Sequence, residues 1–86
     1  MTQVICQVWQ DFAGASDDGP HYSFHLTEGD RAAFVQKNEV AKKGYFYSEA
    51  REHFPCDVTP EIYKKICAMP PGQAFEQDDA PLQQAA

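Results

Sequence analysis

The chain has 86 residues, of which 43% are hydrophobic and 23% are charged. This length leaves room for one small domain, and the composition excludes a wholly disordered chain, a collagen-like repeat and a coiled-coil array. The 13 acidic residues outnumber the 7 basic ones, and the net charge of −6 argues against direct binding of nucleic acid, whose phosphates are also negative.

The sequence predicts a cytoplasmic protein with reduced thiols. No Lys or Arg precedes Arg31, so the basic segment that opens a secretory signal is missing. The longest apolar run, residues 32–35, is far shorter than the ~20 residues that span a bilayer. The three cysteines, Cys6, Cys56 and Cys67, show no paired spacing, so we expect no disulfide framework.

The first half of the chain predicts a β-hairpin followed by a helix. Apolar and polar residues alternate over residues 2–9 and again over residues 21–26, and the Gly, Asp and Pro of residues 13–20 are typical of a loop. Thr27 then precedes a helix predicted over residues 28–43, where it serves as the N-cap.

The second half predicts a third strand and a second helix. Residues 54–58 alternate, and because Pro55 has no N–H to donate, we expect this strand at a sheet edge. Thr59 as N-cap and Pro60 at the first position open a helix, which carries apolar residues at spacings of three and four. These are Ile62, Tyr63, Ile66 and Met69.

We therefore predict an α+β fold in β-β-α-β-α order, with a three-stranded, mostly antiparallel sheet and two helices on one face. The predicted domain covers residues 1–69. Residues 70–86 open with Pro-Pro-Gly and continue with mostly Gln, Ala and acids, which predicts a disordered acidic tail. Phe75 and Leu82 are its bulky apolar residues, and whether they form a docking motif stays open.

Chemical motifs are weak in this sequence. His53 and Cys56 lie three positions apart and Cys67 follows, so these side chains, with His21 or His25 as a fourth ligand, form the alternative of a zinc site. We favour instead cysteines that serve as small hydrophobic side chains and histidines that face solvent. No Ser elbow, P-loop or dinucleotide motif is present, so we predict no enzymatic activity and no cofactor.

Acidic residues dominate the first 30 positions, which contain no Lys or Arg. The five acids are Asp11, Asp17, Asp18, Glu28 and Asp30. An acidic hairpin loop of this kind is suited to a basic protein surface, where it takes the place of nucleic-acid phosphate and speeds association. The alternative is that these acids serve only turn formation and solubility.

Aromatic residues offer a second type of contact. An extended backbone sends Phe46 to one side and both Tyr45 and Tyr47 to the other, so part of this triplet is expected to be exposed. Trp9 lies opposite the face that carries Val4 and Val8, and it is either a further exposed anchor or part of a second core.

We therefore predict a non-enzymatic inhibitor or adaptor that binds a protein with a basic surface, through Asp11, Asp17, Asp18, Trp9, Tyr45 and Tyr47. In size, acidity and lack of a catalytic motif the chain resembles the small inhibitors encoded by phages and mobile elements, including those that block nucleic-acid-targeting defences of the host. The alternative is a homo-oligomeric binder of small molecules or nucleotides, with Trp9, Tyr45 and Tyr47 stacked on ligand rings. A homodimer fits both the inhibitor hypothesis and the small-molecule hypothesis.

Overall fold

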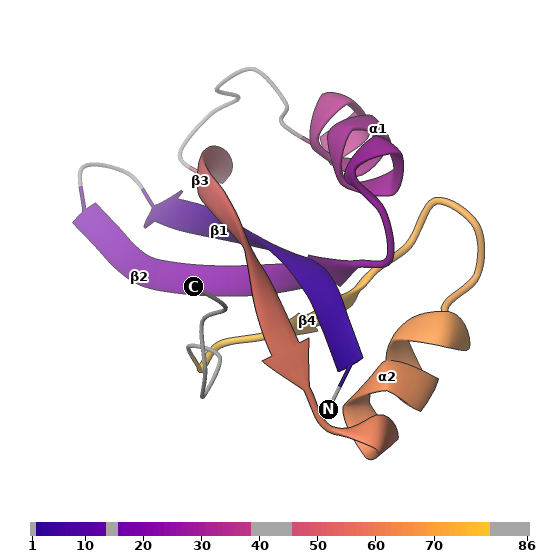
Figure 1. Cartoon of the computed structure of the whole chain (residues 1–86). Helices are drawn as coiled ribbons and strands as arrows, with labels where there is room; N and C mark the ends of the chain where they lie inside the picture. The colour runs from indigo at the N-terminus through magenta and orange to yellow at the C-terminus, as the bar shows by residue number, and fades with distance from the viewer. Residues whose placement is uncertain (1, 14–15, 39–45, 80–86) are drawn as a thin grey trace.

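A computed structural model describes residues 2–13, 16–38 and 46–79. The elements are β1 (Thr2–Ala13), β2 (Ser16–His25), α1 (Glu28–Asn38), β3 (Phe46–Val58), α2 (Pro60–Cys67) and β4 (Phe75–Gln77). The strands form one antiparallel sheet in the order β3-β1-β2-β4 (Figure 1). The predicted α+β class is confirmed, but the sheet has four strands rather than the three predicted.

The β1–β2 hairpin is longer than the sequence pattern predicted. Residues 13–20 were expected to form a loop, whereas β2 already begins at Ser16 and pairs with β1 as far as Ala13. The register shifts between Asp11 and Phe12, and Gly19 takes a φ of +92°, a conformation that glycine adopts without strain. The register shift and the positive φ of Gly19 allow β2 to pair with β1 through a segment that is rich in turn-forming residues.

The third strand is also longer than predicted, because it runs without a break from Phe46 to Val58. It lies at one edge of the sheet, as the missing N–H of Pro55 predicted. Its register with β1 shifts between Gln7 and Trp9, so β3 bulges there over Arg51 and Glu52.

Part of the predicted tail belongs to the sheet. Gly72, with a φ of +83°, lies in the turn after α2, and β4 then pairs with β2 from Tyr22 to Phe24. The ring of Phe75 packs 5.9 Å from that of Phe24, and Ala74 is buried. The prediction of a disordered tail from residue 70 is therefore wrong for this segment, whereas Leu82 lies outside the described residues.

Both helix starts are confirmed. The hydroxyl of Thr59 accepts a hydrogen bond from the backbone N–H of Ile62 (3.2 Å), and that of Thr27 accepts one from Asp30 (3.1 Å). The helix predicted over residues 28–43 is described only to Asn38, because residues 39–45 lie outside the described part of the chain.

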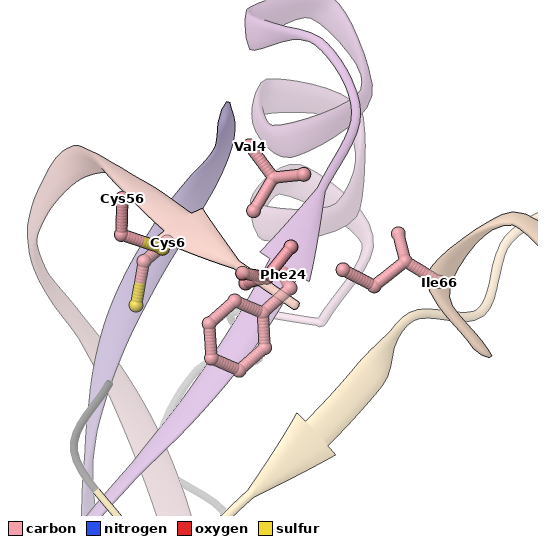
Figure 2. Close-up of a cluster of buried hydrophobic side chains, with 6 residues drawn as sticks. Val4, Cys6, Phe24, Cys56 and Ile66 are labelled. Carbon is pink, nitrogen blue, oxygen red and sulfur yellow. The ribbon is translucent and has the colours of Figure 1, made fainter. Parts of the chain in front are cut away.

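An apolar cluster lies between the sheet and α2. Figure 2 shows Ile66 projecting from α2 toward Phe24 on β2. The buried members of the cluster are Val4, Cys6, Phe24, Cys56, Val58 and Ile66. Ile62 and Tyr63 pack against it from α2, so the predicted apolar stripe is confirmed for Ile62, Tyr63 and Ile66, whereas Met69 lies beyond the end of this helix.

The first helix packs against the other face of the sheet, so the prediction of both helices on one face is wrong. Phe34 of α1 meets the ring of Trp9 edge to face at 6.0 Å and lies 5.0 Å from the ring of His25. Because side chains alternate along a strand, Trp9 and His25 point away from the face that carries Cys6 and Phe24. Figure 1 shows the strands between the two helices.

The position of β4 predicts the effect of one substitution. Phe75→Ala should lower the free energy of unfolding by about 1 to 3 kcal/mol, because it removes a partly buried ring from the cluster around Phe24. Asp78→Ala, at an exposed position of the same segment, should change it by less than about 0.5 kcal/mol. Equal effects of the two substitutions in urea unfolding would show that β4 does not support the core.

Candidate functional site

The acidic end of the hairpin is one candidate interaction surface. Asp17 pairs with Phe12, and Asp18 lies between Asp17 and the positive-φ Gly19, so both acids belong to the first three residues of β2. This end of the hairpin lies far from α2 in Figure 1. The predicted pair of acids is therefore at the end of the hairpin, but on a strand rather than in a long loop.

Asp11 is engaged inside the sheet. Its Oδ2 lies 2.6 Å from Nδ1 of His21, and its Oδ1 accepts a hydrogen bond from the hydroxyl of Ser48. On the other side of the imidazole, Nε2 of His21 lies 3.3 Å from a carboxylate oxygen of Glu76. These four side chains connect β3, β1, β2 and β4 in one row, so the carboxylate of Asp11 already has partners within the chain.

Trp9 is a core residue and not the exposed anchor that the sequence also allowed. Only 1% of it is exposed, because α1 covers it with Phe34 and the ring of His21 stacks on it at 6.0 Å. The two-sided core was the alternative interpretation of its position, and it is the correct one. Trp9 therefore has no free face for a partner or for a ligand ring.

A chain of hydrogen bonds leads from Trp9 to His25. The indole N–H of Trp9 donates to Oγ of Ser23 (2.8 Å), which lies 2.8 Å from Nε2 of His25. A hydroxyl has one donor and two acceptor sites, so Ser23, while accepting from the indole, can donate to Nε2 of one neutral tautomer of His25 or accept from Nε2–H of the other. Ser23 is fully buried, so this Ser–His contact offers no accessible nucleophile.

Burial determines the charge of His25. Desolvation, followed by the nearby positive charge of Arg31, lowers the pKa of His25 to about 4. His25 was predicted to face solvent, yet only 4% of it is exposed. The imidazole is therefore neutral near pH 7 and acts as a hydrogen-bonding core residue.

Gln7 links the β3 bulge to α1. Its side-chain Nε2 donates to the carbonyl of Arg51 (2.8 Å) and approaches those of Val8 (2.9 Å) and Glu52 (3.2 Å), while its Oε1 accepts from the guanidinium of Arg31 (2.8 Å). Gln7 is fully buried, and every polar atom of its amide has a partner.

Arg31 is held in turn by Glu28, one turn earlier on α1. Nε and one terminal nitrogen of the guanidinium donate hydrogen bonds to the carboxylate of Glu28. These bonds hold the pKa of Glu28 below its usual value. The hydrogen-bonded side chains between α1 and the sheet form a polar layer, which consists of Gln7, Trp9, Ser23 and His25 from the strands and Arg31 from α1.

Sequence reasoning missed most of the polar layer. Gln7, Ser23 and His25 are polar residues in strands, and such residues usually face solvent. One signal was present, because Ile5 and Trp9 share a face with Gln7 in the alternating pattern. A large aromatic residue on the presumed outer face indicates that another element covers this face.

The remaining predicted residues are spread over the molecule. Tyr47 lies in β3 opposite Phe12, and Tyr45 lies outside the described residues, so the exposed aromatic pair stays a prediction. His53 approaches Glu28 at 3.7 Å on the α1 side, whereas Cys56 lies in the cluster under α2. Within residues 2–13, 16–38 and 46–79 no group of three His, Cys, Asp or Glu side chains is arranged to hold a metal ion.

Two of the thiols lie side by side in the core. Figure 2 shows Cys6 and Cys56 with neighbouring sulfur atoms, and both are free and buried. The hydrogen bond with Cys56 and burial raise the pKa of Cys6 well above its usual value. Cys6 therefore stays protonated and is a poor nucleophile.

Neutral, buried His25 predicts a specific loss of stability in mild acid. The unfolded chain binds a proton at its ordinary pKa of about 6.5, whereas folded His25 resists protonation until about pH 4, so stability falls as the pH drops through this window. Between pH 7 and pH 5 this contribution is about 2 kcal/mol. Urea unfolding of the protein and of His25→Gln at both pH values measures the difference, because the variant lacks this titration. An identical pH dependence in both proteins would contradict the assignment.

No described helix is long and apolar enough to cross a membrane. No protein-family model, curated protein or solved structure matches this chain.

Proposed function

We propose that this chain is a non-enzymatic cytoplasmic protein that binds a protein with a basic surface, as an inhibitor or adaptor. The observation that carries the proposal is the position of Asp17 and Asp18, which lie together at the end of the β1–β2 hairpin, in a segment without a basic residue before Arg31. A basic surface that normally contacts nucleic-acid phosphates is the kind of partner that this pair of charges suits.

The charges of the described part of the chain support this choice of surface. Its basic side chains belong to other elements: Arg31 and Lys37 to α1, Arg51 to β3, and Lys64 and Lys65 to α2. Two of them already have acidic partners, since Arg31 is paired with Glu28 and Arg51 with Glu49 at 3.1 Å. Lys42 and Lys43 lie outside the described residues.

The contact set is smaller than the sequence predicted. Asp11 is paired with His21 and Trp9 is buried, so the proposal rests on Asp17 and Asp18, with Tyr45 and Tyr47 as predicted aromatic contacts. Acids at the rim of an interface mainly accelerate association through long-range attraction. Buried aromatic contacts mainly slow dissociation.

The test is a pull-down from a lysate of the native host, read by quantitative mass spectrometry. The baits are the unmodified chain, the double variant Asp17→Asn with Asp18→Asn, and a matched control, Asp78→Asn with Asp79→Asn, which removes the same charge from exposed positions near β4. We expect the first bait and the control to enrich the same protein with a basic surface. The hairpin variant should recover at least about fivefold less of it, which corresponds to about 1 kcal/mol.

The salt dependence of the pull-down is a second test of the same interaction. Raising the salt concentration from 50 to 300 mM shortens the electrostatic screening length from more than about 10 Å to less than about 8 Å, so less of the partner protein should be recovered. Equal melting temperatures of the three baits would establish that the folds are intact. Recovery that is insensitive both to salt and to the hairpin substitutions would contradict the proposal.

A further inference from the structure

A cavity of about 290 Å³ lies between α1 and the segment that joins α2 to β4. In Figure 1 this joining segment rises from α2 toward α1 before it enters β4. Phe24 and His25, at the C-terminal end of β2, line the cavity together with Leu26. Asp17 and Asp18 lie at the other end of the same strand, where it begins. The cavity is therefore separate from the surface proposed above for a protein partner.

Apolar atoms form slightly more than half of the wall of the cavity. Phe24 and Ile66 line it from the core, Phe34 from α1, and Met69 from the joining segment. Leu26 also lines the cavity. Among the described residues it is the one large apolar side chain that is exposed, at 41%. Apolar surface in a concave site is typical of ligand-binding pockets.

Two charged side chains of α1 line the same cavity, Asp30 and Lys37. They are seven residues apart, so two helical turns, about 10 Å along the axis, separate their backbone positions. The ammonium of Lys37 lies 3.5 Å from the carbonyl oxygen of Gly72, at the outer limit of a hydrogen bond. The ion pairs between described residues include neither Lys37 nor Asp30, so the charge that selects a ligand is decided by comparing an anionic with a cationic probe.

We propose that this cavity binds a small organic acid, with its apolar body between Phe34 and Leu26 and its carboxylate at Lys37. The apolar part of the wall favours an aromatic or branched aliphatic body, and the ammonium of Lys37, whose contact with the Gly72 carbonyl is long at 3.5 Å, favours an anionic group. The volume is at the lower end of the ~300 to ~1,000 Å³ range of ligand pockets, which favours a small acid over a nucleotide.

The experiment compares three probes that share one body and differ in charge: 3-phenylpropionate, 3-phenylpropanamide and 3-phenylpropylamine. Each is titrated into the ¹⁵N-labelled full chain, and amide shifts are followed by NMR. We expect saturable shifts at Leu26, Ala33 and Ala74 with the carboxylate, and an affinity up to about fivefold higher than that of the neutral amide, the range of a partly exposed ion pair. The amine should bind more weakly than the carboxylate.

Two lysine variants test the role of the ammonium. Lys37→Gln should abolish the preference for the carboxylate over the amide, whereas Lys64→Gln, an exposed lysine of α2 that does not line the cavity, should leave it intact. Absence of saturable shifts at about 10 mM carboxylate would overturn the proposal. It would also be overturned by tighter binding of the amine, which would assign the charge selectivity to Asp30, or by an unchanged preference in Lys37→Gln.

Discussion

The fold depends on one buried side-chain amide. Gln7 occupies the centre of the sheet, where β3 bulges and its carbonyls lack the regular ladder partners, and the amide of Gln7 donates to them. The opposite end of the same amide accepts from Arg31, which fixes α1 over the sheet. Unpaired polar groups in this position would cost about 1 to 3 kcal/mol each, so bulge, strand register and helix position are determined together.

The two faces of the sheet are consequently held by different forces. Under α2 the contacts are apolar and tolerate exchange of similar volumes, because the hydrophobic effect has no direction. Under α1 the ring of Phe34 packs on Trp9 and His25, and directional hydrogen bonds add to this packing: Arg31 donates to Gln7 across the helix–sheet contact, and Trp9, Ser23 and His25 are linked within the sheet. The cavity lies beyond the end of β2, between α1 on one face and the segment that joins α2 to β4.

Local signals predicted the elements well, and long-range pairing explains what they missed. Thr59 with Pro60 marked a helix start and Pro55 an edge strand, because capping and a missing N–H act within a few residues. The three-residue β4 has no pattern of its own and exists only by pairing with β2. Likewise, the burial of Trp9 depends on α1, which covers it from more than 20 positions along the chain, so alternation in β1 indicated that this face is covered but could not identify the covering helix.

The hydrogen bond between Gln7 and Arg31 couples the sheet to α1. A double-mutant cycle with Gln7→Ala and Arg31→Ala measures this coupling from the free energy of unfolding of the four proteins. The two effects should deviate from additivity by about 0.5 to 3 kcal/mol, the range found for directly interacting residues. Additivity within about 0.3 kcal/mol would contradict the claim, because it would mean that the two side chains stabilise the fold independently.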